Sequence, residues 1–368
     1  MATTRISLDA LRELAAFRAE RGCAITLYLD LDPSISPTAG AVAARVRSLL
    51  AKARQHEAPR RDLERLERFF ERDFARAGAR GYAVFAAEGD GAWHDLPLAA
   101  PVTDSVHVGD EFHVAPLLPL LGSGSGALVA FVGRERGSLY HLQDGRLAEL
   151  ADLSDSIPRR HDQGGWAQAR LQRHVDELAA QHFREIADAL DRRFRALGRP
   201  PVVVIATDET RAALDGLLPA ELGEAVVGWA SAEAHATAPQ LEAVVEPLFD
   251  RWRAACEREH VERWREDVGR GVKASAGWAD TLEAASDGRV ELLLHRDGVG
   301  GAVVRCALCG RVQPDGRSCP LDGAPLERRA DGFELLVRPV LAHGGNVWTL
   351  REAKDLDPVG GIGALLRF

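Results

Sequence analysis

The sequence predicts an α/β protein made of three small domains. Short apolar runs of strand length recur along the chain, as in Ala24–Asp30, Ala127–Val132 and Val202–Ala206. Longer segments with amphipathic helical spacing alternate with these runs, which is typical of α/β layers. The chain has 368 residues, more than a single ordinary core accommodates. These three observations favour several α/β domains over one.

The first domain is expected over residues 1–121. Its predicted elements are, in chain order, a helix (Leu8–Glu20), a strand (Ala24–Asp30), two amphipathic helices (Ala41–Gln55 and Asp62–Ala77) and two strands (Tyr82–Ala87 and Val106–Ala115). The glycine-serine run Gly122–Gly126 indicates a flexible joint. We therefore expect a domain boundary at this run.

The second domain is expected over residues 127–268. Its predicted elements are a strand (Ala127–Val132), a hairpin (Ser138–Leu142 and Arg146–Leu150), a polar loop (Ser154–Gly165), a long helix (Trp166 to about Leu197), a strand (Val202–Ala206), a further strand (Ala225–Trp229) and a charged helix (about Pro239–Val268). Asp144 and Gly145 are suited to the hairpin turn. Gly198 and Pro200 are expected to stop the long helix, and Thr207 or Asp208 is a suitable N-cap for the next helix.

The third domain is expected over residues 271–368, with a cysteine-rich insertion at residues 300–330. Its predicted elements are a helix (Trp278–Ala285), a strand (Val290–His295), the insertion, a helix (Gly332–His343) and two strands (Asn346–Leu350 and Gly363–Phe368). This domain is again small α/β.

Composition excludes several classes of protein. Apolar residues make up 46% of the chain, enough for packed interiors, so a disordered protein is excluded. No apolar stretch reaches the roughly 20 residues that cross a bilayer, and Met1–Asp9 lacks the features of a secretory signal. We expect a cytoplasmic protein. The net charge of −9 argues against a protein that coats nucleic acid, but it leaves room for one local RNA contact.

The segment Ile157–His174 carries the most informative motif. Gly164 and Gly165 allow positive φ and a close approach to another surface. Gln168 follows within a turn, and its neutral amide both donates and accepts hydrogen bonds. Basic side chains beside a helix N-terminus suit phosphate binding. Those of this segment are Arg159, Arg160, His161, Arg170, Arg173 and His174. On spacing alone, an ordinary hinge and an exposed helix face would be the better interpretation.

The run Gly164–His174, with its long helix, resembles the central-domain loop of archaeal and eukaryotic translation release factors, whose Gly-Gly-Gln enters the peptidyl-transferase centre. The spacing Gly-x-x-Gln from Gly165 to Gln168 is closer to the bacterial branch of that superfamily and to the Vms/Ankz-type peptidyl-tRNA hydrolases. The last residues, Val359–Phe368, are similar to the closing strand of the third domain in release factors and pelota-like proteins. Two signatures in the expected order support the resemblance more than one short motif would.

The resemblance implies an ester hydrolase that acts on peptidyl-tRNA at the peptidyl-transferase centre of the large ribosomal subunit. It gives the catalytic role to Gln168 with Gly164 and Gly165, and RNA contacts to the six basic residues. It implies no cofactor for catalysis and a recruiting GTPase or ATPase as partner. Codon-reading members carry Asn-Ile-Lys-Ser in the first domain, and that motif does not occur here. Release on stalled ribosomes, independent of a stop codon, is therefore expected.

Other functions are ranked lower. A non-catalytic hibernation or rescue factor of the same superfamily is the main alternative, and the retained Gln168 favours the hydrolase over it. A pelota-like splitting partner ranks next, because pelota lacks the glutamine loop. A two-metal nuclease ranks last, since no acidic cluster accompanies the basic loop.

The cysteine-rich insertion contains two metal-knuckle spacings. Cys306 and Cys309 form a Cys-x-x-Cys pair, and Cys319 is followed at the same spacing by Asp322. Zinc takes four ligands in structural sites, and a carboxylate can be one of them. A structural zinc and a degenerate knuckle with free thiols are both compatible with the spacing.

Overall fold

A computed structural model describes residues 8–35, 37–56, 58–76, 78–98, 101–118, 126–134, 136–143, 146–153 and 166–368, and the side chains of residues 143 and 166–176 lie outside this description. The chain divides into two compact units. Unit 1 combines Met1–Leu121 with Arg258–Phe368, and unit 2 is Gly122–Glu257. The predicted α/β class is confirmed. The division into three domains stays a prediction.

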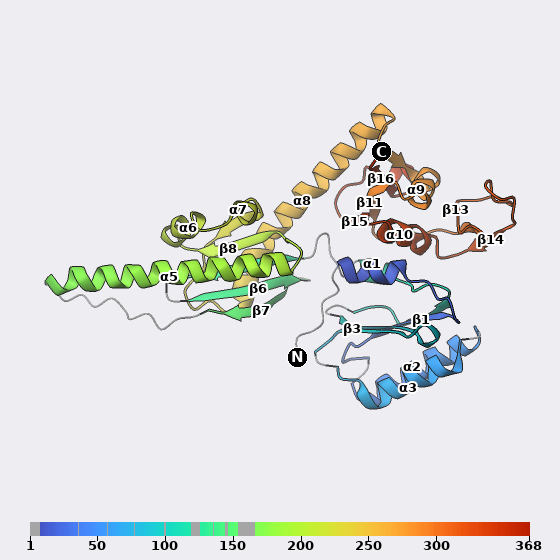
Figure 1. Ribbon diagram of the computed structural model, residues 1–368, viewed down its shortest axis with the longest axis horizontal. Helices are drawn as coiled ribbons and strands as arrows, with labels where there is room; N and C mark the ends of the chain where they lie inside the picture. The colour runs from blue at the N-terminus through green and yellow to red at the C-terminus, as the bar shows by residue number, and fades with distance from the viewer. Residues whose placement is uncertain are drawn as a thin grey trace. The chain divides into compact units, whose positions relative to one another are not determined.

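The N-terminal segment of unit 1 is a sheet with helices on both faces (Figure 1). Its elements are α1 (Leu8–Ala16), β1 (Ala24–Asp30), α2 (Ala39–Arg54), α3 (Arg60–Arg68), the π-helix η1 (Phe69–Asp73), β2 (Gly81–Ala87), the 3-10 helix η2 (Glu88–Asp90), β3 (Ala92–Leu98), β4 (Ser105–Gly109) and the 3-10 helix η3 (Ala115–Leu117). The strand order is β3-β2-β1-β4, and every pairing is antiparallel.

β1 is apolar on both sides because both sides are covered. Ile25, Leu27 and Leu29 pack into the core shared with α2 and α3. Tyr28 belongs to the core on the opposite face, where its ring meets Phe85 edge-on at 6.0 Å. A strand buried on two faces reads as a continuous apolar run rather than an alternating one.

Three of the predicted boundaries in this segment are wrong. The first helix ends at Ala16 rather than at Glu20, because residues 17–19 turn to pair with the chain after β4: Ala19 N–H donates to the Asp110 carbonyl at 2.8 Å. For the same reason β4 ends at Gly109 and not at Ala115. The second amphipathic helix, predicted over Asp62–Ala77, begins at Arg60 instead. It changes to a π-helix after Arg68 and ends at Asp73.

β3 was not expected. It contains Pro97 and has only two buried positions, and proline is tolerated in a strand at a sheet edge. β3 is such an edge, since it pairs only with β2 in the sheet order.

The C-terminal segment of unit 1 contains a second sheet, in the order β10-β16-β11-β15. Its elements are β10 (Ala274–Ala276), α9 (Gly277–Ser286), β11 (Val290–Arg296), β12 (Val303–Cys306), β13 (Val312–Gln313), β14 (Leu326–Arg329), α10 (Gly332–Ala342), β15 (Asn346–Leu350), the 3-10 helix η4 (Asp357–Val359) and β16 (Ile362–Leu366). β11 pairs in parallel with β15 and antiparallel with β16. The insertion forms its own small sheet, β13-β12-β14, which was not expected.

Unit 2 is a sheet in the order β7-β6-β5-β8-β9. Its elements are β5 (Ala127–Val132), β6 (Gly137–Gln143), β7 (Arg146–Asp152), α5 (Trp166–Ala196), β8 (Val202–Ala206), α6 (Asp208–Asp215), α7 (Ala220–Glu224), β9 (Val226–Ala230) and α8 (Ala238–Arg270), whose last turns belong to unit 1. The predicted N-cap Thr207 is confirmed, as its side chain accepts the Thr210 N–H.

Helices cover both faces of this sheet. One face of β5 and β8 packs in a core with α5, and the other face packs in a core that contains Leu241 and Val245 of α8. Within the described residues, no helix combines the length and apolar character needed to span a membrane.

Candidate functional site

The predicted catalytic loop adjoins the start of α5. The site residues that precede the helix lie outside the described residues: Arg159, Arg160, His161, Gly164 and Gly165. Four more belong to α5, where the backbone is described but the side chains are not: Gln168, Arg170, Arg173 and His174. Because α5 begins at Trp166, the backbone of Gln168 lies in the first helical turn. The roles predicted for these residues stay predictions.

A firmly packed helix carries Gln168. Phe183, Ile186, Leu190 and Phe194 are buried at steps of three, four and four residues, and they pack on the sheet of unit 2. Figure 1 shows that α5 is longer than the sheet and that its N-terminal turns extend past the strands. The first turn of a helix has N–H groups without partners in the helix and a partial positive charge. This end of α5 is therefore chemically suited to meet an anion or a carbonyl oxygen.

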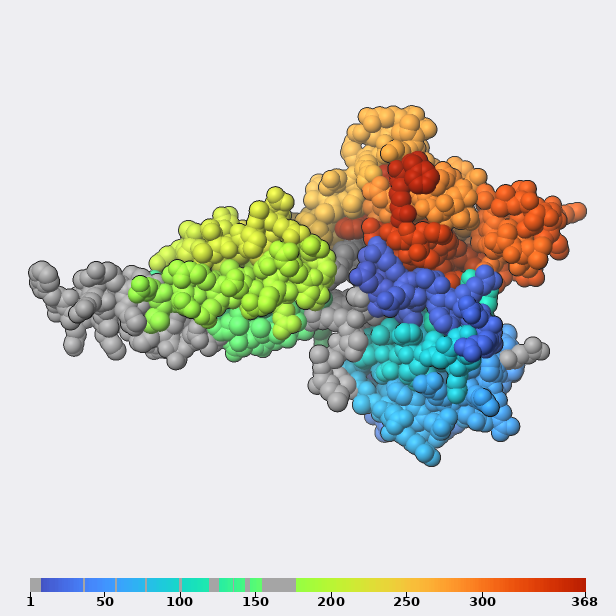
Figure 2. Space-filling model, viewed as in Figure 1, coloured from blue at the N-terminus to red at the C-terminus, as the bar shows by residue number. Residues whose placement is uncertain are grey.

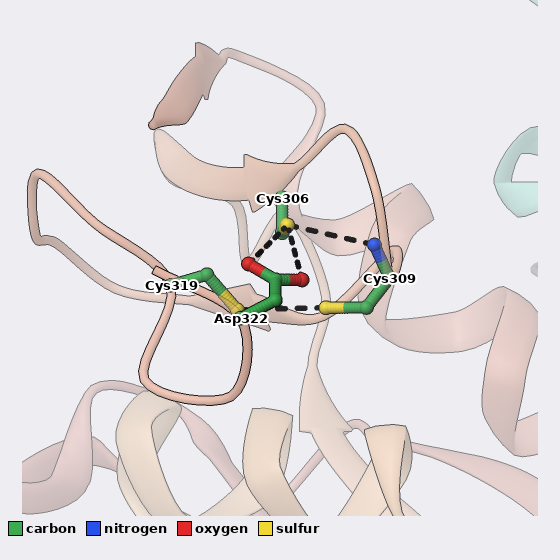
Figure 3. Close-up of side chains that lie close together, drawn as sticks. All are labelled: Cys306, Cys309, Cys319 and Asp322. Atoms are coloured by element: carbon green, nitrogen blue, oxygen red, sulfur yellow. Dashed lines mark hydrogen bonds between the residues drawn. The ribbon is translucent and has the colours of Figure 1, made fainter. Parts of the chain in front are cut away.

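The structure brings together the four residues of the insertion whose spacing predicts a metal site (Figure 3). The ligand atoms of Cys306, Cys309, Cys319 and Asp322 all lie within 4.8 Å of one another. Cys309 Sγ lies 3.5 Å from Cys319 Sγ, and Cys306 Sγ lies 3.3 Å from Asp322 Oδ2. Cys306 and Cys319 are buried, whereas Cys309 and Asp322 are exposed.

Two turns of the same form hold the four ligands. In the first turn Gly310 N–H donates to the Cys306 carbonyl at 3.0 Å, and in the second Gly323 N–H donates to the Cys319 carbonyl at 2.9 Å. The two glycines have φ of 76° and 73°, a left-handed conformation that other residues adopt at a cost. The fourth residue of each turn supplies a ligand, a cysteine in the first and Asp322 in the second. The aspartate therefore replaces a thiol without a change in the turn.

The cluster fits a tetrahedral metal ion. Zinc binds sulfur at about 2.3 Å, which sets neighbouring sulfurs about 3.8 Å apart in a tetrahedron. The 3.5 Å between Cys309 Sγ and Cys319 Sγ is close to that value. The core of the insertion is also small, with Cys306, Cys319 and Ala324 as its buried residues. Small folds with so little apolar interior commonly need a metal or a disulfide.

Proton binding at the cluster follows from its crowding. A backbone hydrogen bond from Arg311 lowers the pKa of the Cys309 thiol, but desolvation and the neighbouring ligands outweigh it and raise the pKa to about 12. Hydrogen bonds from Ala324 N–H and then from Cys309 lower the pKa of Asp322. Without a cation Cys309 therefore keeps its thiol proton, and a bound divalent cation would displace that proton.

A second polar cluster, absent from the sequence predictions, joins the two segments of unit 1. Glu334 in α10 accepts hydrogen bonds from Val114 N–H at 2.9 Å and from Ala115 N–H at 2.7 Å. His113 Nδ1 lies 3.2 Å from Glu334 Oε2. Arg338, one turn further along α10, donates to the Ala15 carbonyl at 2.8 Å, at the last turn of α1, where a cation is favourable.

Burial sets the ionisation of this cluster. Desolvation raises the pKa of Glu334 to about 7, although the hydrogen bonds from Val114 and Ala115 oppose the rise. Desolvation, and then the neighbouring His107, lower the pKa of His113 to about 3. His113 is therefore neutral near pH 7, and its Nδ1–H group can donate a hydrogen bond to Glu334. A signal existed in the sequence: Glu334 and Arg338 interrupt an otherwise apolar helix, and charged residues are seldom fully buried without partners.

Comparison with known proteins gives one family match. The model of bacterial archaeo-eukaryotic release factor family 10 matches residues 113–248. That range includes Gly164, Gly165 and the whole of α5. No curated protein matches the chain.

Several solved structures have low similarity to this chain. The archaeal translation termination factor aRF1 is 16% identical, with 99% of each chain covered and a TM-score of 0.29. A chain of ribosome-bound archaeal Pelota and ABCE1 is 14% identical, with 99% of this chain and 95% of that chain covered and a TM-score of 0.41. Dom34 of S. cerevisiae, a translation termination-like factor that interacts with Hbs1, is 10% identical, with 78% and 79% covered and a TM-score of 0.40. We base no inference on superpositions this loose.

Proposed function

We propose that this chain, which belongs to the bacterial branch of the archaeal and eukaryotic release-factor superfamily, hydrolyses the peptidyl-tRNA ester on stalled ribosomes without reading a stop codon. The observation that carries the proposal is the family match over residues 113–248. Within that range, Gln168 of the Gly-x-x-Gln motif lies at the start of α5. The match supports a translation factor of this superfamily, and the glutamine motif favours a hydrolytic member.

In the proposed mechanism Gln168 orients the attacking water. The side-chain amide does not titrate, so it cannot act as a general base. It can hold a water molecule against the ester carbonyl and exclude competing nucleophiles. The backbone N–H groups of the first turn of α5, and those of Gly164 and Gly165, would stabilise the oxyanion that develops during attack. Removal of one such donor typically costs about 10²–10³ in rate.

The basic residues of the loop and of α5 would fix the pose on RNA. Guanidinium groups bind phosphate in a bidentate manner, and phosphate contacts position a protein without reading sequence. The large ribosomal subunit at the peptidyl-transferase centre, with its peptidyl-tRNA, is the proposed partner. A recruiting GTPase or ATPase, which the sequence resemblance implies, is the second proposed partner. Ribosome binding would make this a cytoplasmic protein.

A peptide-release assay tests the hydrolase. Purified ribosome–nascent-chain complexes are incubated with wild type, with Gln168→Ala, and with Gln172→Ala as a control one turn further along α5. We expect Gln168→Ala to lose at least about 10²-fold in release rate while it still co-sediments with ribosomes. Gln172→Ala should release peptide as the wild type does. Equal release by wild type and Gln168→Ala would sink the catalytic assignment.

The same assay separates the hydrolase from a resting-ribosome binder. A non-catalytic hibernation or rescue factor would bind 70S particles from starved cells and release no peptide in any variant. That outcome would replace the hydrolase proposal.

We also propose that Cys306, Cys309, Cys319 and Asp322 bind a structural zinc ion. The support is the convergence of the four ligand atoms within 4.8 Å and the repeated turn that holds them. The ion would join the two turns and stabilise the insertion, and it would take no part in ester hydrolysis.

A further inference from the structure

Residues 39–80 have a charge opposite in sign to that of the whole chain. They contain eleven lysines and arginines against six acidic residues, whereas the chain has a net charge of −9. This stretch forms α2, α3 and η1, which cover one face of the N-terminal sheet. Figure 2 shows it in light blue at the surface of unit 1. A local excess of positive charge in an acidic protein needs a specific explanation.

Three of the five acidic residues of α3 and η1 are already in ion pairs. Glu64 accepts from Arg60 at 2.7 Å within the helix. Glu67 and Glu71 pair with arginines of α2, with N–O distances of 2.6 Å and 3.2 Å. These three carboxylates lie along one side of the helix, and those of Glu67 and Glu71 face α2. They are therefore occupied by the cations beside them.

The remaining arginines form a separate row, which we name the basic stripe: Arg61, Arg65, Arg68 and Arg72. They follow one another at steps of four, three and four residues, so they lie along one side of α3 and η1. Leu63, Leu66 and Phe70 mark the buried side of the same helices. By helical geometry the stripe points away from that side.

The stripe is available to a ligand. Arg61, Arg68 and Arg72 are exposed, and within the described part of the chain none of the three forms an ion pair; Arg68 only donates to the Glu64 carbonyl at 3.2 Å. Arginine side chains lose much rotamer freedom when held in place. Because no ion pair among the described residues holds these three side chains, most of their N–H donors are free to bind an anion.

An aromatic residue lies beside the stripe. The Arg65 guanidinium is stacked over the Trp93 indole of β3, 4.4 Å from the ring centroid, and the adjacent His94 is exposed. The stack holds one guanidinium of the row in a fixed plane. Arginines mixed with aromatic rings at a surface are typical of nucleic-acid contacts.

We propose that the basic stripe binds the phosphate backbone of RNA. A row of guanidinium groups matches a row of phosphates, because each can make bidentate bonds to phosphate oxygens. The contact would read charge and shape and not sequence. It adds an RNA-binding surface in unit 1 to the loop at α5. The inference deepens the proposed ribosomal function, but it depends on no catalytic step.

The test measures binding of a labelled RNA duplex by fluorescence anisotropy across about 50–200 mM salt. The variant Arg61→Gln/Arg68→Gln/Arg72→Gln removes three charges and keeps good helix formers. The matched control, Arg258→Gln/Arg270→Gln/Arg328→Gln, removes three charges from exposed arginines elsewhere in unit 1. We expect at least about tenfold weaker binding for the stripe variant at 0.1 M salt and a slope of log K against log salt smaller by about two to three. The control should bind as the wild type does.

Further variants keep the proposal falsifiable. Arg61→Lys/Arg68→Lys/Arg72→Lys retains the charge and should retain the salt slope, whereas Gln168→Ala should bind the duplex normally. Wild-type affinity in a folded stripe variant would overturn the inference, and it would leave the hydrolase proposal intact. Equally tight binding of poly-glutamate and RNA by the wild type would overturn it too, since the stripe would then suit an acidic protein.

Discussion

Replacement of Glu334 by glutamine should change how the stability of unit 1 depends on pH. The carboxyl group lies in α10 against Val114, Ala115 and His113, and burial raises its pKa to about 7. Arg338 and Asp331 are the other charged groups that act on it, with opposite effects on the pKa. Glutamine keeps the size of the side chain and cannot titrate.

Because burial raises the pKa of Glu334, its proton stabilises the folded state at low pH. The folded state holds the Glu334 proton up to about pH 7, whereas the unfolded chain releases it near 4.5. The stability that this proton contributes is therefore complete below pH 4.5 and is lost as the pH rises through 7. One pKa unit corresponds to about 1.4 kcal/mol, so the full loss is about 3 kcal/mol, and about 2.5 kcal/mol of it falls between pH 5 and 8.

His113 acts in the opposite direction. Its pKa falls from 6.5 to about 3, so its contribution is present above pH 6.5 and is lost as the pH falls toward 3. Between pH 5 and 8 this recovers about 2 kcal/mol. The two groups nearly cancel in the wild type, and the variant should reveal the effect of His113 alone.

Calorimetric unfolding of both proteins at several pH values is the assay. The free energy of unfolding of Glu334→Gln, minus that of wild type, should increase by about 2.5 kcal/mol from pH 5 to pH 8. Any loss of hydrogen bonds from Val114 or Ala115 adds an offset that does not depend on pH. Glu327→Gln, at an exposed position, is the control. A difference between variant and wild type that stays constant with pH would refute the reasoning.

The remaining predictions concern the metal cluster and the support of α5. Purified protein should contain about one zinc per chain, and Cys306→Ser/Cys309→Ser should contain almost none by metal analysis; its residues 300–330 should then be cut faster by protease, and a zinc-free wild type would contradict the site. Leu190→Ala opens a cavity under α5, where Leu190 is fully buried, and should lower the stability of unit 2 by about 2–5 kcal/mol in urea unfolding; a loss below about 1 kcal/mol would show that α5 is not held as described.

Local patterns in the sequence were enough for the elements that are buried on both faces or that end in a strong signal. β1, β5 and β8 have the predicted bounds to the residue, because a run of apolar residues at that length is typical of a buried strand. α5 was predicted to within one residue of its end, since Gly198 follows it with a φ of 76°. Short or edge strands such as β3 and β13 carry few buried residues, so their pattern is weak.

The spacing of Cys306, Cys309, Cys319 and Asp322 also determined a candidate ligand set from sequence alone, because ligands of one turn are neighbours in the chain. That the two turns face each other was decided by the small sheet of the insertion.

Contacts between distant segments were decided only in the tertiary structure. Glu334 meets Val114 across 220 positions of the chain, and α1 ends where the chain pairs with Asp110. No local pattern encodes such partners, because the free energy of these contacts comes from burying two segments together. The sequence thus determined which residues were suited to strands, helices and ligands, and packing decided which of them meet.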